Sequence, residues 1–285
     1  MRRIGDLASW RAYCDEQRRL GRTVGLVPTM GALHEGHTSL FRAARERGDV
    51  VVATLFVNPR QFHDDHDLAA YPRTPDIDRA IAEENGVDCL IEPALPTMWP
   101  DYPAATLTTV SVAGIGESFE GIGRPGHFDG VASVVAKLFA LTGPCRAYFG
   151  EKDFQQLAVV RQMARDLSFD VSFVACPILR DADGLALSSR NAQLSDDGRR
   201  RALVVSRALY NAQEHPDTAS GHRRSFARSL ADGDVVVAYA DVVDPMTLRP
   251  LGDDDEGVGR ALLAVVVDGV RLIDNGDVDV KRGEH

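Results

Sequence analysis

The feature that most constrains the fold is an alternation, along the first two thirds of the chain, between short apolar runs and longer amphipathic segments. The apolar runs have the length of β-strands, and residues 50–57 are apolar almost throughout, as is typical of a strand buried on both faces. This order predicts an α/β fold with a parallel sheet that has helices on both faces. Strands are expected at 24–29, 50–57, 87–91, 145–149 and 170–176, and helices at 36–47, from residue 75, at 128–141 and at 154–167.

The pattern changes near residue 177, where we place a domain boundary. Two later apolar runs predict a smaller sheet, and the acidic tetrad 253–256 between them predicts a solvated hairpin loop, since it lacks the ligand spacing of a calcium loop. We therefore predict a first domain of residues 1–176 and a smaller α+β domain of residues 177–285. The second domain is expected to have a charged helix at about 196–214, a polar stretch at 215–222 and strands at 235–243 and 261–267.

The charge balance bears on the partners of the protein. There are 42 acidic residues against 32 Lys and Arg, which gives a formal net charge of −10. A surface of this sign repels phosphate backbones and anionic lipids, so we expect no nucleic-acid and no membrane partner. A small anionic substrate stays possible, because a few cations can be focused in one cleft.

Membrane and redox signals are consistent with a soluble protein. No apolar run approaches the ~18 residues of a membrane span, and the first residues lack the apolar core of a signal peptide. The four cysteines are far apart and form no Cys-x-x-Cys pair. They are interpreted as buried small residues in a reducing compartment, which predicts a cytoplasmic location.

Polar side chains gather after three of the predicted strands. Residues 28–37 follow the first, residues 58–61 follow the second, and residues 150–156 follow the strand at 145–149. Ligands of open α/β sheets bind outside the carboxyl ends of the strands. We expect these strands to be neighbours, so that their ends converge on one crevice.

Two segments could bind phosphate. In residues 34–37, His-Glu-Gly-His, a strand passes through a glycine-containing turn into a helix, which aims N–H groups and a helix dipole at an anion. The alternative is a pair of histidines that only cap the helix. Residues 187–191 offer two hydroxyls and a guanidinium that could clamp a polyphosphate, or a serine-rich turn that caps a helix. The Gly-x-Gly-x-x-Gly match at 121–126 follows no buried strand, so a dinucleotide fingerprint is rejected.

Taken together, these segments resemble the pantothenate synthetase (pantoate–β-alanine ligase) family of the nucleotidyltransferase-like α/β superfamily. The resemblance extends over essentially the whole chain, and its ordered set of motifs is specific. It is carried by residues 27–37, 56–62, 71–74, 124–128, 150–156, 183–191 and 271–275. Leu187 departs from the family pattern, which has methionine there. The family implies a Rossmann-like, doubly wound parallel sheet, with the second domain as a lid over the ATP site.

The resemblance also implies a reaction. ATP adenylates the carboxylate of (R)-pantoate and releases pyrophosphate, and the amine of β-alanine then attacks the enzyme-bound pantoyl adenylate to give pantothenate and AMP. The resemblance further implies that the protein uses ATP as a substrate, requires Mg²⁺ and forms a homodimer. Enzymes stabilise the charge that develops in such a step with fixed donors and magnesium.

The family's functional residues carry over to matching positions. Those implied for catalysis are His37, His34, Lys152 and Arg190. Those implied for ATP are Met30, Gly31, Ala32, Leu33, His34, Glu35, Gly36, His37, Gly150, Glu151, Lys152, Asp153, Leu179, Leu187, Ser188, Ser189 and Arg190. Gln61, Gln156, Asn58 and Tyr71 are implied for pantoate and β-alanine, and Asp78 and Asp153 are guesses for magnesium.

Two other readings compete with a ligase. A plain nucleotidyltransferase would move AMP onto a phosphate acceptor, but it would need cations where this chain has two glutamines. A non-catalytic nucleotide-binding module would keep the glycines, but it has no reason to keep both histidines, Lys152 and Arg190 together.

Overall fold

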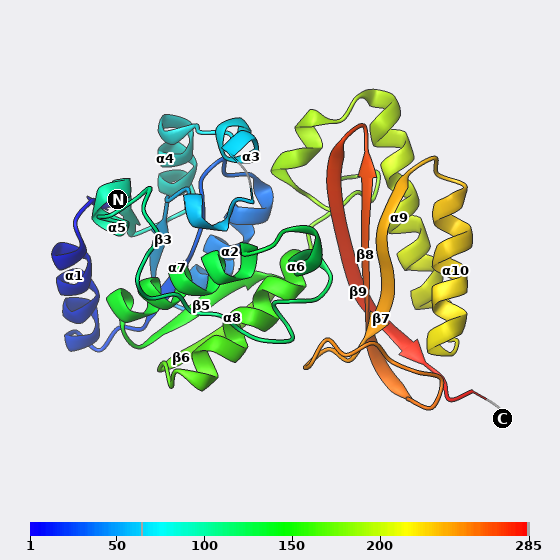
Figure 1. Cartoon of the computed structure of the whole chain (residues 1–285). Coiled ribbons are helices and arrows are strands. Elements are labelled where there is room, and N and C mark those ends of the chain that lie inside the picture. Colours follow the sequence, from blue (N-terminus) through cyan, green and yellow to red (C-terminus); the bar gives the residue numbers. More distant parts are fainter. Residues whose placement is uncertain (64, 284–285) are drawn as a thin grey trace. The chain divides into compact units, whose positions relative to one another are not determined.

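The computed structural model describes residues 1–63 and 65–283, and they form two compact units. The first unit consists of Met1–Glu151 and Gln155–Pro177, and the second of Lys152–Phe154 and Ile178–His285. Figure 1 shows a sheet with helices in the first unit and a smaller sheet with two long helices in the second. The turn Lys152–Phe154, which the sequence places in the first domain, packs with the second unit.

The first unit is built on a six-stranded parallel sheet in the order β1-β4-β3-β2-β5-β6. The strands are β1 (Arg2–Ile4), β2 (Val24–Val27), β3 (Val50–Thr54), β4 (Cys89–Ile91), β5 (Cys145–Gly150) and β6 (Val171–Cys176). The helices are α1 (Leu7–Arg19), α2 (Glu35–Glu46), α3 (Asp65–Ala70), α4 (Pro75–Glu84), α5 (Leu95–Met98), α6 (Glu120–Gly123), α7 (His127–Thr142) and α8 (Phe154–Asp166), with short 3-10 turns η1 (Pro59–Gln61) and η2 (Glu151–Asp153). The predicted α/β class is therefore confirmed.

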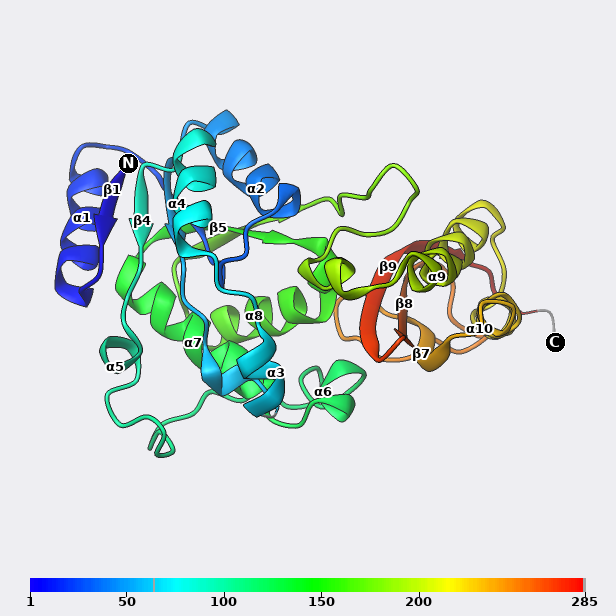
Figure 2. The ribbon, with the colours of Figure 1, turned by 90° about the horizontal axis from the view of Figure 1, so that it is seen from above.

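Helices cover both faces of this sheet because successive strand residues point to opposite sides. Val50 and Val52 pack with residues of α1, α7 and α8, whereas Val51 and Ala53 pack with residues of α2 and α4. Figure 2 shows α2 and α4 on one side of the sheet and α7 and α8 on the other. A strand with apolar partners on both faces needs apolar residues at every position, which explains the continuous run.

Several predicted boundaries differ from the structure. β2 ends at Val27 rather than residue 29, since Pro28 has no N–H to donate to a ladder. β4 begins at Cys89 rather than at residue 87. The N–H of Val87 donates to the carbonyl of Ala82 and closes the end of α4 instead of joining the sheet. The sequence did not predict the edge strand β1 or helix α1. Polar residues near the N-terminus interrupt the apolar pattern by which these elements would be recognised.

The second unit has a three-stranded antiparallel sheet in the order β7-β8-β9, packed with two helices. Its elements are the 3-10 turn η3 (Ser189–Gln193), α9 (Asp196–Glu214), α10 (Ala219–Ala231), β7 (Val236–Val243), β8 (Gly257–Val267) and β9 (Val270–Val280). The predicted helix at 196–214 and the smaller sheet are confirmed. The polar stretch at 215–222 instead includes the start of α10, whose N-cap is Thr218.

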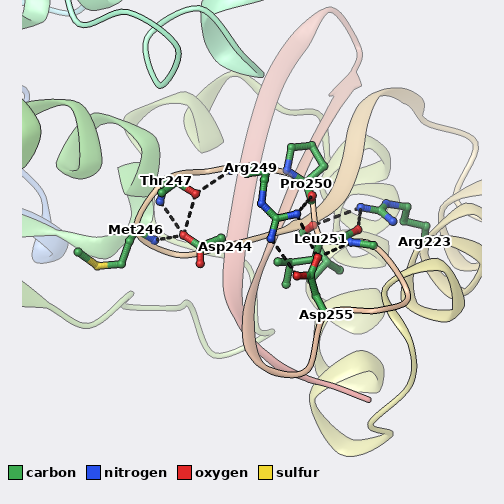
Figure 3. Close-up of polar contacts among 10 residues, drawn as sticks. Arg223, Asp244, Met246, Thr247, Arg249, Pro250, Leu251 and Asp255 are labelled. Atoms are coloured by element: carbon green, nitrogen blue, oxygen red, sulfur yellow. Dashed lines mark hydrogen bonds and ion pairs between the residues drawn. The ribbon is translucent and has the colours of Figure 1, made fainter. Parts of the chain in front are cut away.

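In the acidic tetrad between β7 and β8, Asp255 is half-buried and the other three residues are exposed, and the loop is held by hydrogen bonds and an ion pair. Asp255 pairs with Arg249 at 2.9 Å, and Asp244 accepts hydrogen bonds from Thr247, as Figure 3 shows. Asp253 accepts from the N–H and hydroxyl of Ser220. These contacts fix the connection between the two strands. In residues 1–63 and 65–283, no helix is long and apolar enough to cross a membrane.

Candidate active site

The three strands that carry the polar motifs are neighbours, as expected. β2 pairs in parallel with β3 on one side and with β5 on the other, so their carboxyl ends leave the sheet at one edge. Beyond the ladder, the N–H of Thr29 donates to Oγ1 of Thr54 at 3.1 Å, and the N–H of Phe56 donates to the carbonyl of Thr29 at 3.2 Å. These bonds keep the segments that follow β2 and β3 close together.

The turn after β2 is held by a buried carboxylate. Oδ2 of Asp78 accepts from the N–H of Ala32 at 3.0 Å, and Oδ1 accepts from the N–H of Leu33 at 2.8 Å. The Asp78 side chain is 2% exposed and also accepts from Thr74. Gly31 has φ +85°, and a Cβ there would lie 2.9 Å from Oδ2 of Asp78, so this position requires glycine on both counts. Asp78 therefore shapes the predicted nucleotide turn.

The two histidines form a reciprocal cap at the start of α2. Nδ1 of His34 accepts from the N–H of Gly36 at 3.1 Å, and Nδ1 of His37 accepts from the N–H of His34 at 3.3 Å. In a neutral imidazole whose Nδ1 accepts, the proton is on Nε2. The cap thus uses Nδ1 of each ring as an acceptor. A Cβ at Gly36 would lie 2.8 Å from Cε1 of His34, so a larger residue there would push the His34 ring from its capping position, a reason that the sequence did not reveal.

A buried amide fixes the orientation of Gln61. Nδ2 of Asn58 donates to Oε1 of Gln61 and to the carbonyl of Gly130, each at 3.1 Å, and Oδ1 of Asn58 accepts from Trp99 at 3.0 Å. Because the oxygen of Gln61 is used in this way, its NH₂ group is directed elsewhere, and it donates to Sδ of Met30 at 3.0 Å. Asn58 is 1% exposed, so it supports Gln61 rather than offering its own amide.

Two more contacts were not predicted for this region. Nδ1 of His127, at the start of α7, lies 2.7 Å from the carbonyl of Gln61 and holds the backbone there. Tyr71 packs edge-on against Phe62, with ring centroids 5.5 Å apart. The sequence signal for His127 was its place in the 124–128 motif, which by itself did not indicate this contact.

The two glutamines of α8 have different surroundings. Oε1 of Gln155 accepts from the N–H of Glu120, and its NH₂ donates to the carbonyls of Ile115 and Ser118, so this buried side chain is structural. Gln156 is half-buried, and its side chain forms no hydrogen bond within the described part of the chain. Of this pair, Gln156 is the one that can offer an amide to a ligand.

The other predicted ATP residues are divided by the two units. In the first unit, Gly150 ends β5 and Glu151 begins η2. Lys152 and Asp153 belong to the second unit, where Nζ of Lys152 lies 3.7 Å from Oδ1 of Asp153. In the second unit, the N–H of Leu187 donates to the carbonyl of Leu179 at 2.9 Å.

The predicted phosphate clamp has a defined local structure. Oγ of Ser188 accepts from the N–H of Arg190 at 3.2 Å and caps η3, which Ser189 begins. The alternative of a serine cap is therefore present, but it uses only one of the two hydroxyls. Within the described residues, the guanidinium of Arg190 forms no hydrogen bond or ion pair. The serine cap uses the backbone N–H of Arg190 and not its charged side chain.

The two predicted magnesium ligands, Asp78 and Asp153, differ in how well their surroundings suit a metal ion. Mg²⁺ that arrives with nucleotide phosphates needs only one or two protein carboxylates. The side chain of Asp153 is 52% exposed and fits this need. Both oxygens of Asp78 accept from backbone N–H groups in a buried position, and these contacts do not favour it as a ligand. No cluster of three or more His, Cys, Asp and Glu side chains in residues 1–63 and 65–283 could hold a metal.

The four cysteines are buried and unpaired, as predicted. Burial is the main cause that raises the pKa of each thiol, to about 11 for Cys14 and Cys176 and to about 12 for Cys89 and Cys145. These thiols are packing residues and take no part in the site.

A parallel sheet with capped histidines and buried amides at its carboxyl edge defines an α/β protein with a ligand site at the position that is usual for such folds. The chain matches the family model described as pantoate-beta-alanine ligase over residues 2–277. It is 46% identical to a pantothenate synthetase of Koribacter versatilis, over 96% of this chain and 95% of that one. It is 48% identical to one of Cereibacter sphaeroides, over 94% and 96%. The chain belongs to the pantoate–β-alanine ligase family.

Solved structures agree with this assignment. The crystal structure of pantothenate synthetase from Thermus thermophilus has a TM-score of 0.88 at 44% identity and covers 97% of this chain and 99% of its own. A pantoate-beta-alanine ligase from Francisella tularensis, complexed with beta-gamma ATP and beta-alanine, has a TM-score of 0.80 at 30% identity and covers 97% of each chain. The expected Rossmann-like fold is therefore confirmed.

Proposed function

We propose that this chain condenses (R)-pantoate with β-alanine and uses ATP, which yields pantothenate, AMP and pyrophosphate through an enzyme-bound pantoyl adenylate. Membership of the ligase family over nearly the whole chain supports this activity. The first step joins a pantoate carboxylate oxygen to the α-phosphorus of ATP and breaks the bond to pyrophosphate. The second forms the amide bond, releases AMP and frees the proton of the β-alanine amine.

The contact between Met30 and Gln61 is the observation that carries the proposal. Met30 begins the predicted nucleotide segment, and Gln61 is a predicted pantoate ligand. Nε2 of Gln61 donates to Sδ of Met30 at 3.0 Å, so the two segments touch. A carboxylate can attack an α-phosphate only if the two are held within ~3–3.5 Å, and adjoining sites meet that requirement.

In the first step, the capped histidines act as donors to the nucleotide. Nδ1 of each ring accepts from backbone, so Nε2 is the atom that would donate to phosphate oxygens, and the N-terminus of α2 adds its dipole. Lys152 and Arg190 of the second unit add positive charge for the departing pyrophosphate. The family treats His37 as the proton donor, and we propose that its electrostatic support of the α-phosphate is at least as important, since pyrophosphate needs little protonation to leave.

Pantoate is held by amides rather than by a cation. Asn58 directs the NH₂ of Gln61 toward Met30 and the nucleotide segment, and Gln156 offers a second amide, with Tyr71 as support. A neutral donor orients a carboxylate without forming the tight ion pair that would reduce its nucleophilicity. This choice distinguishes the ligase from a nucleotidyltransferase with a phosphate acceptor, whose site would need cations.

Magnesium, the assembly and the location are part of the same proposal. Asp153, whose side chain is 52% exposed, is the carboxylate that would hold Mg²⁺, which would offset the charge of the ATP phosphates. Leu187, Ser188, Ser189 and Arg190 form a flap over the phosphates. We also propose a cytoplasmic homodimer, with four free thiols in agreement with a reducing compartment.

The test is pantoate-dependent exchange of labelled pyrophosphate into ATP, measured without β-alanine. A ligase of this mechanism catalyses the exchange, and β-alanine then converts the adenylate to pantothenate. A nucleotidyltransferase would not require pantoate, and a binding module would give no exchange. Either result would contradict the proposed function.

A further inference from the structure

A buried amide in β9 has no part in the proposed chemistry. Asn275 is 3% exposed and lies in the second unit, which also contains the turn Lys152–Phe154. Its Nδ2 donates to the backbone carbonyl of Lys152 at 2.8 Å, across 123 positions of sequence. The residue in this contact is the lysine proposed to act on the phosphates.

Arg260, in the neighbouring strand β8, fixes the orientation of this amide. Nε of Arg260 donates to Oδ1 of Asn275 at 2.9 Å, and Nη2 donates to the same oxygen. A guanidinium has donors only, so the oxygen of Asn275 must face Arg260, and its NH₂ must face Lys152. The orientation of the amide is therefore determined by the structure around it.

The same arginine makes a second contact with the turn. The guanidinium carbon of Arg260 lies 4.2 Å from the centroid of the Phe154 ring, and the Arg260 side chain is almost fully buried. The turn is thus attached to the sheet at two points, the Lys152 carbonyl and the Phe154 ring. Burying an arginine and an amide is costly unless their donors and acceptors are satisfied. Apolar side chains could fill this position with a smaller desolvation penalty. The burial of Arg260 and Asn275 therefore points to a specific role in holding the turn.

We propose that Asn275 is a positioning residue that sets the backbone of Lys152, so that its ammonium group reaches the phosphates in the adenylation step. The inference rests on the role of Lys152 in the proposed function. A lysine side chain is long and flexible, and its reach depends on where its Cα is held. A loss of position of the order of 1 Å can reduce a rate by about 10²-fold.

The test is Asn275→Asp. Aspartate has the same shape and still accepts from Arg260, but it has no hydrogen to donate to the carbonyl of Lys152. We expect kcat of pantoate-dependent exchange to fall about tenfold, the effect of one hydrogen bond, with the pantoate KM within about twofold of wild type. The matched control is Asp277→Asn in the same strand: Asp277 also bonds to Arg260, but it is exposed, and this variant should keep the wild-type kcat.

A double-mutant cycle separates positioning from a general structural effect. In a Lys152→Ala background there is no ammonium group to place, so Asn275→Asp should cause no further loss of the residual exchange. If it lowers that residual rate by the same factor as in wild type, or if it leaves kcat unchanged by itself, the proposal is overturned. If Asn275→Asp does not fold, Phe154→Leu, which removes the second attachment, is used in the same cycle with the same criteria.

The outcome also distinguishes this inference from the proposed function. A Lys152→Ala variant with wild-type exchange would contradict the role of Lys152 itself. A Lys152→Ala variant that is impaired, together with an Asn275→Asp variant that is not, would contradict only the positioning role.

Discussion

Asn58 donates a hydrogen bond from its side-chain amide to Oε1 of Gln61 at 3.1 Å and thereby leaves the NH₂ of Gln61 to face the nucleotide segment. This relationship makes Gln61 a donor, which is what a substrate carboxylate requires.

Gln61→Glu should therefore impair pantoate binding without loss of the fold. Glutamate still accepts from Asn58, but an oxygen replaces the NH₂ group that we propose binds pantoate, and two carboxylates repel each other. We expect the pantoate KM to rise by about 10–100-fold, with the ATP KM within a factor of about three. Steady-state kinetics with each substrate varied check this. An equal rise in both values would contradict the assignment of Gln61 to pantoate.

Asp78→Asn should disturb the turn that precedes the histidines. An amide NH₂ would face one of the backbone N–H groups of Ala32 and Leu33, which leaves a buried donor without a partner. We expect stability to fall by about 1–3 kcal/mol and exchange to fall about tenfold or more. Urea denaturation and the exchange assay measure the two effects. Asp76→Asn on the same helix is the control, because the Asp76 side chain is 94% exposed. An unchanged exchange rate for Asp78→Asn would show that the turn does not depend on this carboxylate.

Lys152→Ala should lower adenylation by about 10²–10³-fold, the scale of one preorganised donor in a transition state. The circular dichroism spectrum should stay that of wild type, since among the described residues the ammonium group has a single polar contact, 3.7 Å from Asp153. Lys281→Ala serves as the control, because that lysine is exposed. Near-normal turnover of Lys152→Ala would rule out its phosphate role.

The two adjacent glutamines of α8 should give opposite results. Gln156→Ala should raise the pantoate KM by about tenfold and leave stability unchanged, because its side chain has no partner within the described residues. Gln155→Ala should lower stability by about 1–3 kcal/mol, because it leaves the N–H of Glu120 and the carbonyls of Ile115 and Ser118 unpaired. Melting curves and pantoate kinetics for both variants test the distinction. Equal pantoate KM values for the two variants would count against Gln156 as a ligand.

The native thiols should resist alkylation. Burial raises the pKa of Cys14 to about 11 and that of Cys89 to about 12, so little thiolate exists at neutral pH. Mass spectrometry after iodoacetamide treatment at about pH 7.5 should find no label in native protein and labelled cysteines in denaturant. Rapid labelling of the native protein would contradict the burial of these thiols.

The same pKa shifts predict an alkaline loss of stability. The raised folded-state pKa values contribute stability that is fully present below the unfolded thiol pKa of about 9. This contribution is lost as the pH rises from there toward about 12, because the unfolded chain releases its protons first. Urea denaturation at a series of alkaline pH values measures the loss, and a free energy of unfolding that stays constant over this range would contradict the prediction.

Much of the fold could be read directly from the chain. The alternation of apolar and amphipathic segments determined the α/β class, because a strand covered on both faces must be apolar throughout, as Val50 to Thr54 nearly are. The adjacency of β2, β3 and β5 was predicted from the polar segments that follow these strands, and the motifs placed the chain in its family. These features are local or periodic, so they are visible without coordinates.

The tertiary structure decided how the polar side chains are used. Asp78, Asn58 and Gln155 looked like surface or ligand-binding residues in the sequence, but each is buried and bonded to groups far away in the chain. β9 was missed for the same reason, since Asp274 and Asn275 interrupt its apolar pattern and are satisfied by Arg180 and Arg260. A buried polar group is stable only with a partner, and the partner's position is set by the folded chain rather than by sequence spacing.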